Sequence, residues 1–193
     1  YDDNVKRLSL ELRKLPNLAT YIHPDGTIEY FDNPEKVEQY IKITNGSFPL
    51  TKSINYQVIT NGRLTIYKDN KHSGESLNFN LVNRNIPQQA YADLATIGWD
   101  KMISSIVLHC DYVNKDLNDP NPTYPNNLYL GKCIATFFSE KNFGGYSIWF
   151  AVDAAYTDSH IDYFTSYPLF PGSSKNWNDA TRSFIFKFSD YNN

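Results

Sequence analysis

The side chains that most often carry catalysis or bind transition metals are scattered through this sequence. The histidines are far apart, and none belongs to an HExxH motif or a close pair. There is no Gly-x-Ser-x-Gly turn, no phosphate-binding glycine-rich loop and no cysteine with a convincing histidine partner. No spacing among the acidic residues selects a catalytic pair. We therefore predict that the protein is not an enzyme and that its four histidines are structural: His23, His72, His109 and His160.

The two cysteines, Cys110 and Cys133, border a polar segment, residues 111–132. They lack the spacing of a zinc site. In an oxidising compartment they could close this segment into a loop, which would contribute about 3 kcal/mol in the chain-entropy description. The alternative is two free thiols packed at strand ends. The sequence favours neither, because it does not give the separation of the Cα atoms.

The composition excludes several classes of protein. The 193 residues include 18 Lys and Arg against 21 Asp and Glu, a net charge of −3 that argues against a nucleic-acid partner. No apolar run approaches the roughly 20 residues of a membrane-spanning helix. With 15 Tyr, 12 Phe and 3 Trp, the sequence is rich in aromatic residues, which favour strands.

Residues 1–53 differ in pattern from the rest of the chain. Apolar residues recur at helical spacing up to Pro16, which predicts a short amphipathic helix. Two apolar stretches around the turn His23–Gly26 predict a hairpin. A capping pattern that begins at Asp32 predicts a second helix, which ends near Asn45. We expect this small α/β N-terminal extension to pack on the main domain, because so short a segment can hardly stabilise itself.

The main domain, residues 54–193, has the alternating pattern of half-buried antiparallel strands. Asn61-Gly62 separates two such strands and predicts a tight hairpin. Residues 111–132 read as a polar insertion. The stretch Gln88–Thr96 is the only candidate for helix in this domain.

An internal repeat carries the most information. Ile66–Ser76 aligns with Phe137–Ser147: each has an aromatic residue, four residues, a second ring, one residue, Gly, one residue and Ser. Trp99–Ser105 aligns with Trp177–Ser183. In the first pair of blocks, the Gly would allow a positive φ, the ring would pack over the folded hairpin, and the Ser could hold the loop by a local hydrogen bond.

These blocks resemble the βγ-crystallin Greek key. Its hairpin signature is aromatic-x-x-x-x-aromatic-x-Gly, and its loop signature is [Asn/Asp]-[Asn/Asp]-x-x-[Ser/Thr]-Ser. The resemblance covers motif one, residues 63–110, and motif two, residues 133–188, but not the N-terminal extension. It implies an all-β fold, a βγ-crystallin-like Greek-key β-sandwich.

The resemblance also implies calcium sites, as in microbial members of the family. Calcium binds six to eight oxygen atoms from carboxylates, hydroxyls, carbonyls and water. In the family's scheme, a site combines the acidic loop of one motif with the fifth-position hydroxyl of the other. Carried onto this sequence, the scheme selects Asp179 and Ser104, with backbone oxygens from Ala180 and from Ser139 or Lys68.

The sequence departs from the family's pattern at two positions. Lys101 stands where motif one should offer a carboxylate or amide, and Arg182 stands where motif two should offer a hydroxyl. Neither side chain can donate a lone pair to a cation, and both substitutions should fall on one site, with a side-chain cation in place of the metal. We therefore expect at most one weak calcium site. The alternative is that both sites are lost and that the acidic loops only shape turns.

The resemblance implies a non-enzymatic, calcium-binding protein with a structural or interaction role. We expect it to be secreted. The sequence begins at Tyr1 without Met and without an apolar signal run, which is expected either of a chain whose leader has been removed or of a trimmed sequence. The alternative is a protein–protein inhibitor, similar to microbial metalloprotease inhibitors, or a protein similar to killer toxins. Its protein partner would then contact the N-terminal extension or the insertion, because binding residues concentrate on loops held by rigid scaffolds.

Overall fold

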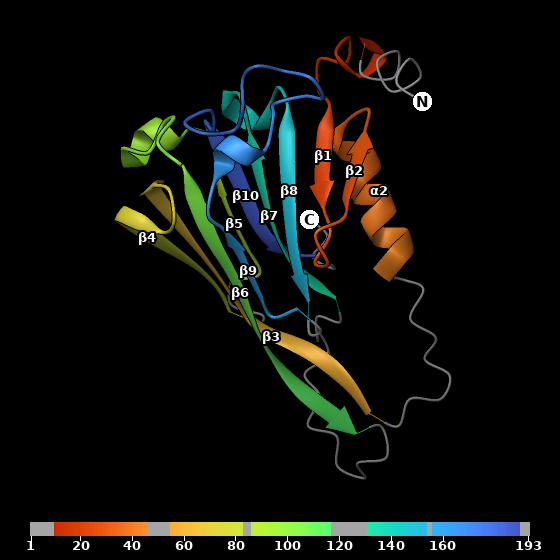
Figure 1. The fold of residues 1–193 in the computed structure, drawn as a ribbon. Helices are drawn as coiled ribbons and strands as arrows, with labels where there is room; N and C mark the ends of the chain where they lie inside the picture. Colours follow the sequence, from red (N-terminus) through yellow and green to blue (C-terminus); the bar gives the residue numbers. More distant parts are fainter. Residues whose placement is uncertain (1–9, 46–54, 83–85, 117–130, 154–155, 190–193) are drawn as a thin grey trace.

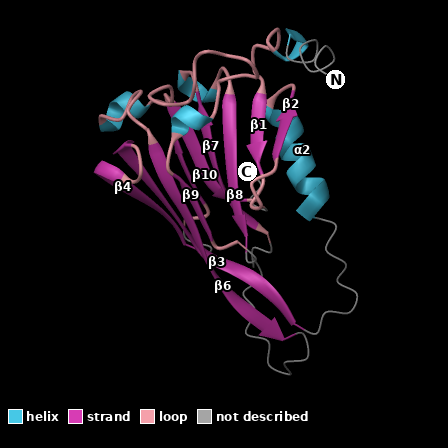
Figure 2. Ribbon diagram, in the orientation of Figure 1, coloured by secondary structure: helices cyan, strands magenta, loops and turns pink. Residues whose placement is uncertain are grey.

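The computed structural model describes residues 10–45, 55–82, 86–116, 131–153 and 156–189. Two β-sheets pack against each other, and one helix lies on the outside of the larger sheet (Figures 1 and 2). The strands are β1 (Ala19–Ile22), β2 (Ile28–Phe31), β3 (Asn55–Asp69), β4 (Ser73–Val82), β5 (Gln88–Tyr91), β6 (Ser105–Asp116), β7 (Lys132–Phe138), β8 (Ser147–Asp153), β9 (Asp158–Ile161) and β10 (Ser183–Phe188). The helical segments are α2 (Pro34–Asn45), η1 (Leu94–Ile97), η2 (Lys141–Phe143) and η3 (Phe164–Ser166).

The two halves of the main domain exchange one strand each. In the first half, β3, β4 and β6 form the four-stranded sheet, while β5 pairs with β10 in the other sheet. In the second half, β7, β8 and β10 lie in the six-stranded sheet, while β9 pairs with β6. The sheet orders are β4-β3-β6-β9 and β2-β1-β8-β7-β10-β5. This reciprocal order confirms the prediction of an all-β, βγ-crystallin-like Greek-key sandwich.

The two hairpins of the repeat have the same backbone conformation. His72 and Phe143 are both left-handed, with φ of 56° and 60°, and Gly74 and Gly145 follow at 75° and 74°. A Cβ on Gly74 would lie 2.3 Å from a carboxylate oxygen of Asp69, so this close turn requires glycine. The second ring of each signature contacts the first, at centroid distances of 5.4 Å in one hairpin and 5.7 Å in the other. The predicted duplication is therefore present in the structure.

The core between the sheets is mainly aromatic. Phe137 lies within 6.2 Å of the rings of Phe150, Phe164 and Phe184, measured between centroids. All four rings are buried; three come from β7, β8 and β10 of the six-stranded sheet, and Phe164 comes from the segment η3 that follows β9. Burial of each such side chain contributes about 1.5–3 kcal/mol. The aromatic surplus of the sequence is thus largely explained by packing.

The N-terminal segment continues the larger sheet. β1 pairs in parallel with β8, and the hairpin to β2 adds the outermost strand. Asn33 caps α2 by accepting a hydrogen bond from the backbone N–H of Lys36 at 3.0 Å. α2 packs through Val37 and Ile41 on the outer face of the sheet. The residues that it meets there form a second apolar cluster: Ala19, Tyr21, Ile134, Trp149 and Ala151.

Two local predictions are wrong. Asn61-Gly62 is not a hairpin turn, because β3 continues through it, with a shift of register against β6 between Ile59 and Asn61. Gly62 is needed for space: a Cβ there would lie 2.7 Å from the sulfur of Cys133. The stretch Gln88–Thr96 is not helical throughout, since Gln88–Tyr91 forms β5 before the short turn η1. Tertiary pairing with β10 overrides the local propensity there.

Several predicted boundaries lie outside the described residues. They include the first part of the predicted N-terminal helix, of which residues 10–12 are helical, and the domain boundary between residues 53 and 54. β6 runs on to Asp116, so the predicted insertion, residues 111–132, begins as strand. None of the helices in the described ranges is long and apolar enough to span a membrane.

Replacement of Gly62 by alanine should destabilise the protein by about 1–3 kcal/mol, because the new methyl group overpacks the core against Cys133 and Phe186. Urea unfolding measures the change. A second replacement, Cys133→Ala, should recover part of the loss, which a double-mutant cycle would detect as coupling. Gly144→Ala is the matched control, since φ is −103° and the nearest atom would be 3.4 Å away. Equal losses in both glycine variants would contradict the packing argument.

Candidate functional site

The two tryptophan-led loops meet at one end of the sandwich. The backbone N–H of Lys101 donates to the carbonyl of Thr181 at 2.9 Å, and that of Asp179 donates to the carbonyl of Ile103 at 3.2 Å. Lys101 and Asp179 occupy equivalent positions and have left-handed φ values of 56° and 54°. The two loops are therefore related by an approximate twofold axis, and each one is held by the other.

Three of the predicted ligands come together on one side of this junction. The hydroxyl of Ser104 donates to the carbonyl oxygen of Lys68 at 2.6 Å and lies 3.3 Å from a carboxylate oxygen of Asp179. Ser104 is buried, whereas Asp179 is exposed. A hydroxyl has one proton, so the carbonyl and the carboxylate compete for it. A cation bound among these oxygens would remove that competition.

The surroundings of this cluster fit a hard cation such as calcium. Asn178, which sequence reasoning did not select, donates to the second carboxylate oxygen of Asp179 at 2.7 Å. Its own amide oxygen is buried and accepts no hydrogen bond from any of the described residues. The ammonium group of Lys68 is bound to Glu75 at 2.6 Å and lies 5.3 Å from the ring centroid of Trp99, so an acidic partner balances its charge. Carboxylate, amide, hydroxyl and carbonyl oxygens are the donors that calcium prefers.

The other two predicted ligands, Ala180 and Ser139, make hydrogen bonds within their own turns. Ala180 follows Asp179 in the turn, and its backbone N–H donates to the carbonyl of Trp177 at 3.2 Å. Ser139 lies at the position in motif two that corresponds to Lys68 in motif one. Its hydroxyl accepts a hydrogen bond from the backbone N–H of Tyr146 at 2.9 Å, within its own hairpin. Of the two alternatives for the hairpin carbonyl, Lys68 is therefore the one beside Ser104.

The equivalent position on the other side of the twofold axis is filled by Arg182. Its Nε donates to Asp100 and its Nη1 donates to Glu140, each at 3.2 Å. Arg182 replaces the hydroxyl that Ser104 supplies on the first side, and Lys101 replaces the carboxylate of Asp179. The guanidinium group of Arg182 therefore lies between two carboxylates. Its hydrogen bond to Asp100 is the main cause of the raised pKa of Arg182.

Two further serines, which the sequence analysis assigned no contact, join each hairpin to the last strand of its motif. Ser105 donates to the carbonyl of Asp69 at 2.6 Å and accepts from the backbone N–H of His72 at 3.0 Å. Ser183 makes the same pair of bonds, with Glu140 at 2.6 Å and Phe143 at 3.1 Å. These are the final serines of the two loop signatures, so the repeat itself was the available signal. Ser76 and Ser147, which end the two hairpin signatures, are not the serines that make these bonds.

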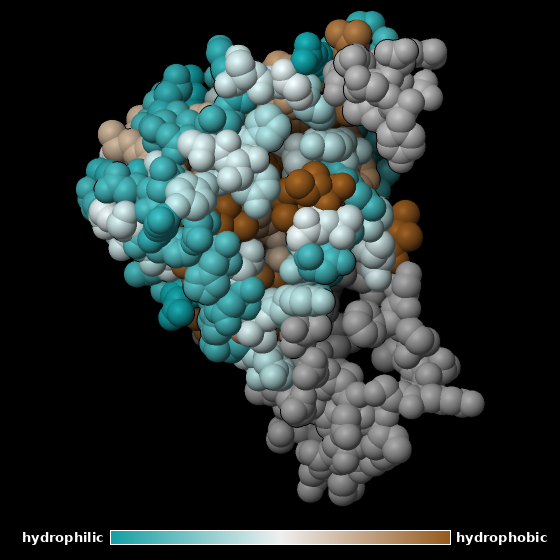
Figure 3. Space-filling model, viewed as in Figure 1, coloured by the Kyte–Doolittle hydropathy of each residue, from teal (hydrophilic) through white to brown (hydrophobic). Residues whose placement is uncertain are grey.

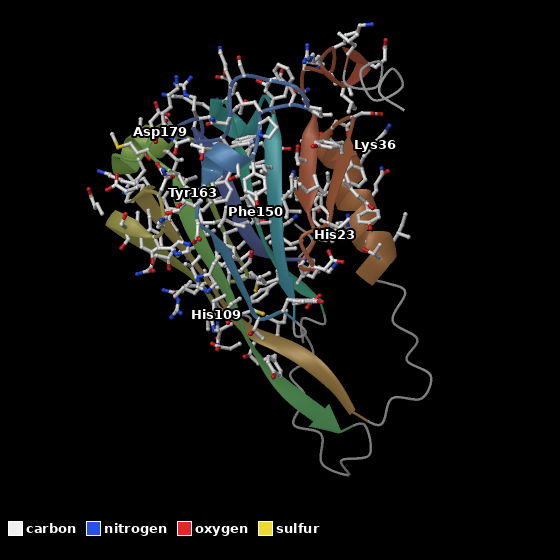
Figure 4. All side chains as sticks on the ribbon, viewed as in Figure 1. His23, Lys36, His109, Phe150, Tyr163 and Asp179 are labelled. Carbon is white, nitrogen blue, oxygen red and sulfur yellow. The ribbon has the colours of Figure 1, made fainter. Side chains whose placement is uncertain are left out.

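Figure 4 shows Asp179 at the loop end of the sandwich, well away from His109 and His23. In Figure 3 the side chains over that end are mainly hydrophilic. Within the described ranges, no three His, Cys, Asp or Glu side chains converge as a metal-binding group. A cation at Asp179 would thus depend on one carboxylate and on neutral oxygens, which favours weak binding.

His109 forms a second polar cluster, on the outer face of the four-stranded sheet. Its Nδ1 lies 2.6 Å from Asp158, and its Nε2 lies 3.1 Å from Asp111. Arg63 is the neighbouring residue of β3 in the register. Burial opposes protonation, but the hydrogen bonds to the two carboxylates outweigh it and raise the pKa of His109. When His109 is protonated, the cluster is an ion pair with two carboxylates, which accords with a structural role.

The chain was compared with family models, curated proteins and solved structures. No family model matches the chain, and no curated protein matches it. Among solved structures, the chain is similar to a βγ-crystallin from Ciona intestinalis, with 15% sequence identity and a TM-score of 0.35. The match covers 63% of this chain and 95% of that one. The strand exchange and the paired hydrogen bonds define the fold of this chain independently of that match.

His109 should stabilise the protein at acidic pH. Its folded-state pKa lies above the unfolded value of about 6.5, so its contribution is complete below that pH and is lost as the pH rises through the folded-state value. Urea unfolding across pH 5.5 to 9 should show this loss, and His109→Gln should remove it. Ser159→Ala, on the same strand as Asp158, should keep it. The interpretation fails if His109→Gln leaves the pH dependence unchanged.

Proposed function

We propose that this protein is a non-enzymatic, secreted βγ-crystallin-like protein that binds one calcium ion weakly and has a structural or interaction role. The observation that carries the proposal is the convergence of Asp179, Ser104 and the Lys68 carbonyl. The occupied counterpart at Arg182 supports a single site rather than two. The Kd we expect is about 10⁻⁴ to 10⁻³ M, as in extracellular calcium modules with few carboxylates.

A calcium ion would supply a positive charge that the oxygens of two motifs share. Ser104 and the Lys68 carbonyl belong to motif one, while Asp179 and Ala180 belong to motif two. A ligand that binds only the folded state stabilises it in proportion to its occupancy. The role that we propose for the ion is therefore to strengthen the junction between the two halves of the sandwich.

Calorimetric titration of chelator-treated protein with calcium should give one weak site, and 10 mM calcium should raise the free energy of unfolding by about 1.4–2.7 kcal/mol. Asp179→Ala should abolish both effects. Because φ at Asp179 is positive, Asp179→Asn is the better-tolerated variant, and it should weaken binding at least tenfold while the fold is kept.

Glu140→Gln is the matched control for this titration, because it removes one carboxylate from the Arg182 side and should leave calcium binding intact. The double variant Lys101→Asp, Arg182→Ser restores the oxygen donors of the counterpart position and should raise the stoichiometry from one to two. Heat that is absent from the wild type, or equal in Asp179→Ala, would reject the site.

One observation favours the alternative of a protein–protein inhibitor. β3 and β6 pair with each other from Asn55 to Ile59, beyond the residues that β4 and β9 cover. Figure 1 shows this two-stranded ribbon projecting from the sandwich. Two strands alone are marginally stable in water, so a partner protein would stabilise the ribbon. The open strand edges can accept a further strand from such a partner.

A panel of metalloproteases tests this alternative. If the ribbon binds a protease, the wild type should inhibit at least one member of the panel, and Tyr112→Ala should weaken the inhibition about tenfold or more. Tyr112 is 40% exposed on the ribbon, and Tyr156, 50% exposed elsewhere, provides the control variant Tyr156→Ala. Absence of inhibition across the panel would leave the calcium-binding proposal as the sole candidate.

A further inference from the structure

Two buried thiols from different sheets lie at one corner of the core. Cys110 is on β6 of the four-stranded sheet, and Cys133 is on β7 of the six-stranded sheet. Both side chains are at most 1% exposed and belong to the same apolar cluster. Both are free thiols in the structure.

Gly62 places the two sulfur atoms next to each other. It pairs with Cys110 across β3 and β6, so the two residues are neighbours on one face of the sheet. A Cβ on Gly62 would lie 2.7 Å from the sulfur of Cys133. Cys133 therefore fills the space that a side chain beside Cys110 would otherwise occupy.

Both cysteines also lie next to the same end of β8. The Cys110 thiol donates to the carbonyl of Asp153 at 3.4 Å, and Cys133 pairs with Val152, the residue before Asp153 on β8. Some Cα atoms of β6 and β7 lie within 8 Å of each other, although these strands belong to different sheets. Burial is the main cause of the raised pKa of the Cys133 thiol, and a hydrogen bond with the Cys110 thiol adds to it.

We propose that Cys110 and Cys133 form an intramolecular disulfide under oxidising conditions, and that this bond joins the two sheets of the sandwich. The bond would also connect the two ends of the segment 111–132. It is independent of calcium, since neither cysteine is among the residues at Asp179. Conformational restriction of the unfolded chain by this loop would stabilise the folded protein.

The chemistry requires a thiol oxidant, for which a small disulfide such as oxidised glutathione is sufficient. The thiolate of one cysteine attacks a glutathione sulfur, forms a mixed disulfide and releases one glutathione thiolate. The thiolate of the second cysteine then displaces the other glutathione and closes the protein disulfide. Two electrons pass to the oxidant, and the two cysteine protons end on the two released glutathiones.

Burial determines when this reaction can happen. A buried thiol with a raised pKa reacts slowly, because the thiolate is the nucleophile and must meet the oxidant. The disulfide should therefore form while the chain folds or opens, and the core should then shield it from reductants. Folded, reduced protein should oxidise much more slowly than protein that refolds in the same buffer.

The test is to refold the protein in a glutathione redox buffer, block thiols under denaturing conditions with an alkylating agent, and map the peptides by mass spectrometry. The expected result is a peptide pair joined through Cys110 and Cys133, with neither residue alkylated. Tm should be about 5–10 °C higher for the oxidised than for the reduced wild type. The double variant Cys110→Ala, Cys133→Ala should show no difference between the two conditions.

The comparison of oxidised with reduced wild type needs no substitution, so it remains decisive even if the double variant does not fold. The single variant Cys133→Ala should leave Cys110 alkylated or glutathionylated. Three results would overturn the proposal: both cysteines alkylated after refolding, disulfides only between molecules, or an intramolecular bond that leaves Tm unchanged.

Discussion

The exchange of β5 and β9 between the two sheets is the constraint on which the structure depends. Each of these strands leaves its own motif and pairs with the last strand of the other, so neither motif can complete a sheet alone. The chain must then return across the end of the sandwich, and the returning segments are the two tryptophan-led loops. They meet there and bond to each other through backbone groups, Lys101 with Thr181 and Asp179 with Ile103. The candidate calcium site is a product of this crossing, because its oxygens come from both motifs.

The backbone is nearly symmetric, but the side chains at the junction are not. On one side, the Ser104 hydroxyl has a single proton, for which the Lys68 carbonyl and the Asp179 carboxylate compete. On the other side, Arg182 donates to Asp100 and Glu140, so the positive charge there belongs to the protein. The two halves of the junction thus have the same requirement, which is that the negative charge of their clustered oxygen atoms be balanced, but they meet it in two different ways. On the Asp179 side, the balancing charge would have to come from a cation in solution. On the Arg182 side, it comes from the guanidinium group of the protein itself.

The parts of the fold that sequence could predict are those in which a local pattern repeats. The two hairpins and the two loops recur with the same residue types, and this predicted the Greek-key sandwich and the meeting of Asp179 with Ser104. The errors arose where a distant contact decides the local conformation. Asn61-Gly62 looks like a hairpin turn, but Gly62 is required by the sulfur of Cys133, which is far away in the sequence. The proximity of Cys110 and Cys133 and the ion pairs of Arg182 depend in the same way on contacts across the sandwich.

The parallel pairing of β1 with β8 makes the N-terminal strands and α2, residues 19–45, part of the fold rather than an appendage. A crystallin-type sandwich cut out of this chain would leave the backbone of β8 with an open edge, and the apolar surface of Ile134 and Trp149 would lose the cover of α2. Such a fragment would tend to self-associate. The repeated unit, residues 63–188, is therefore smaller than the body that the sheet pairing and the α2 packing hold together.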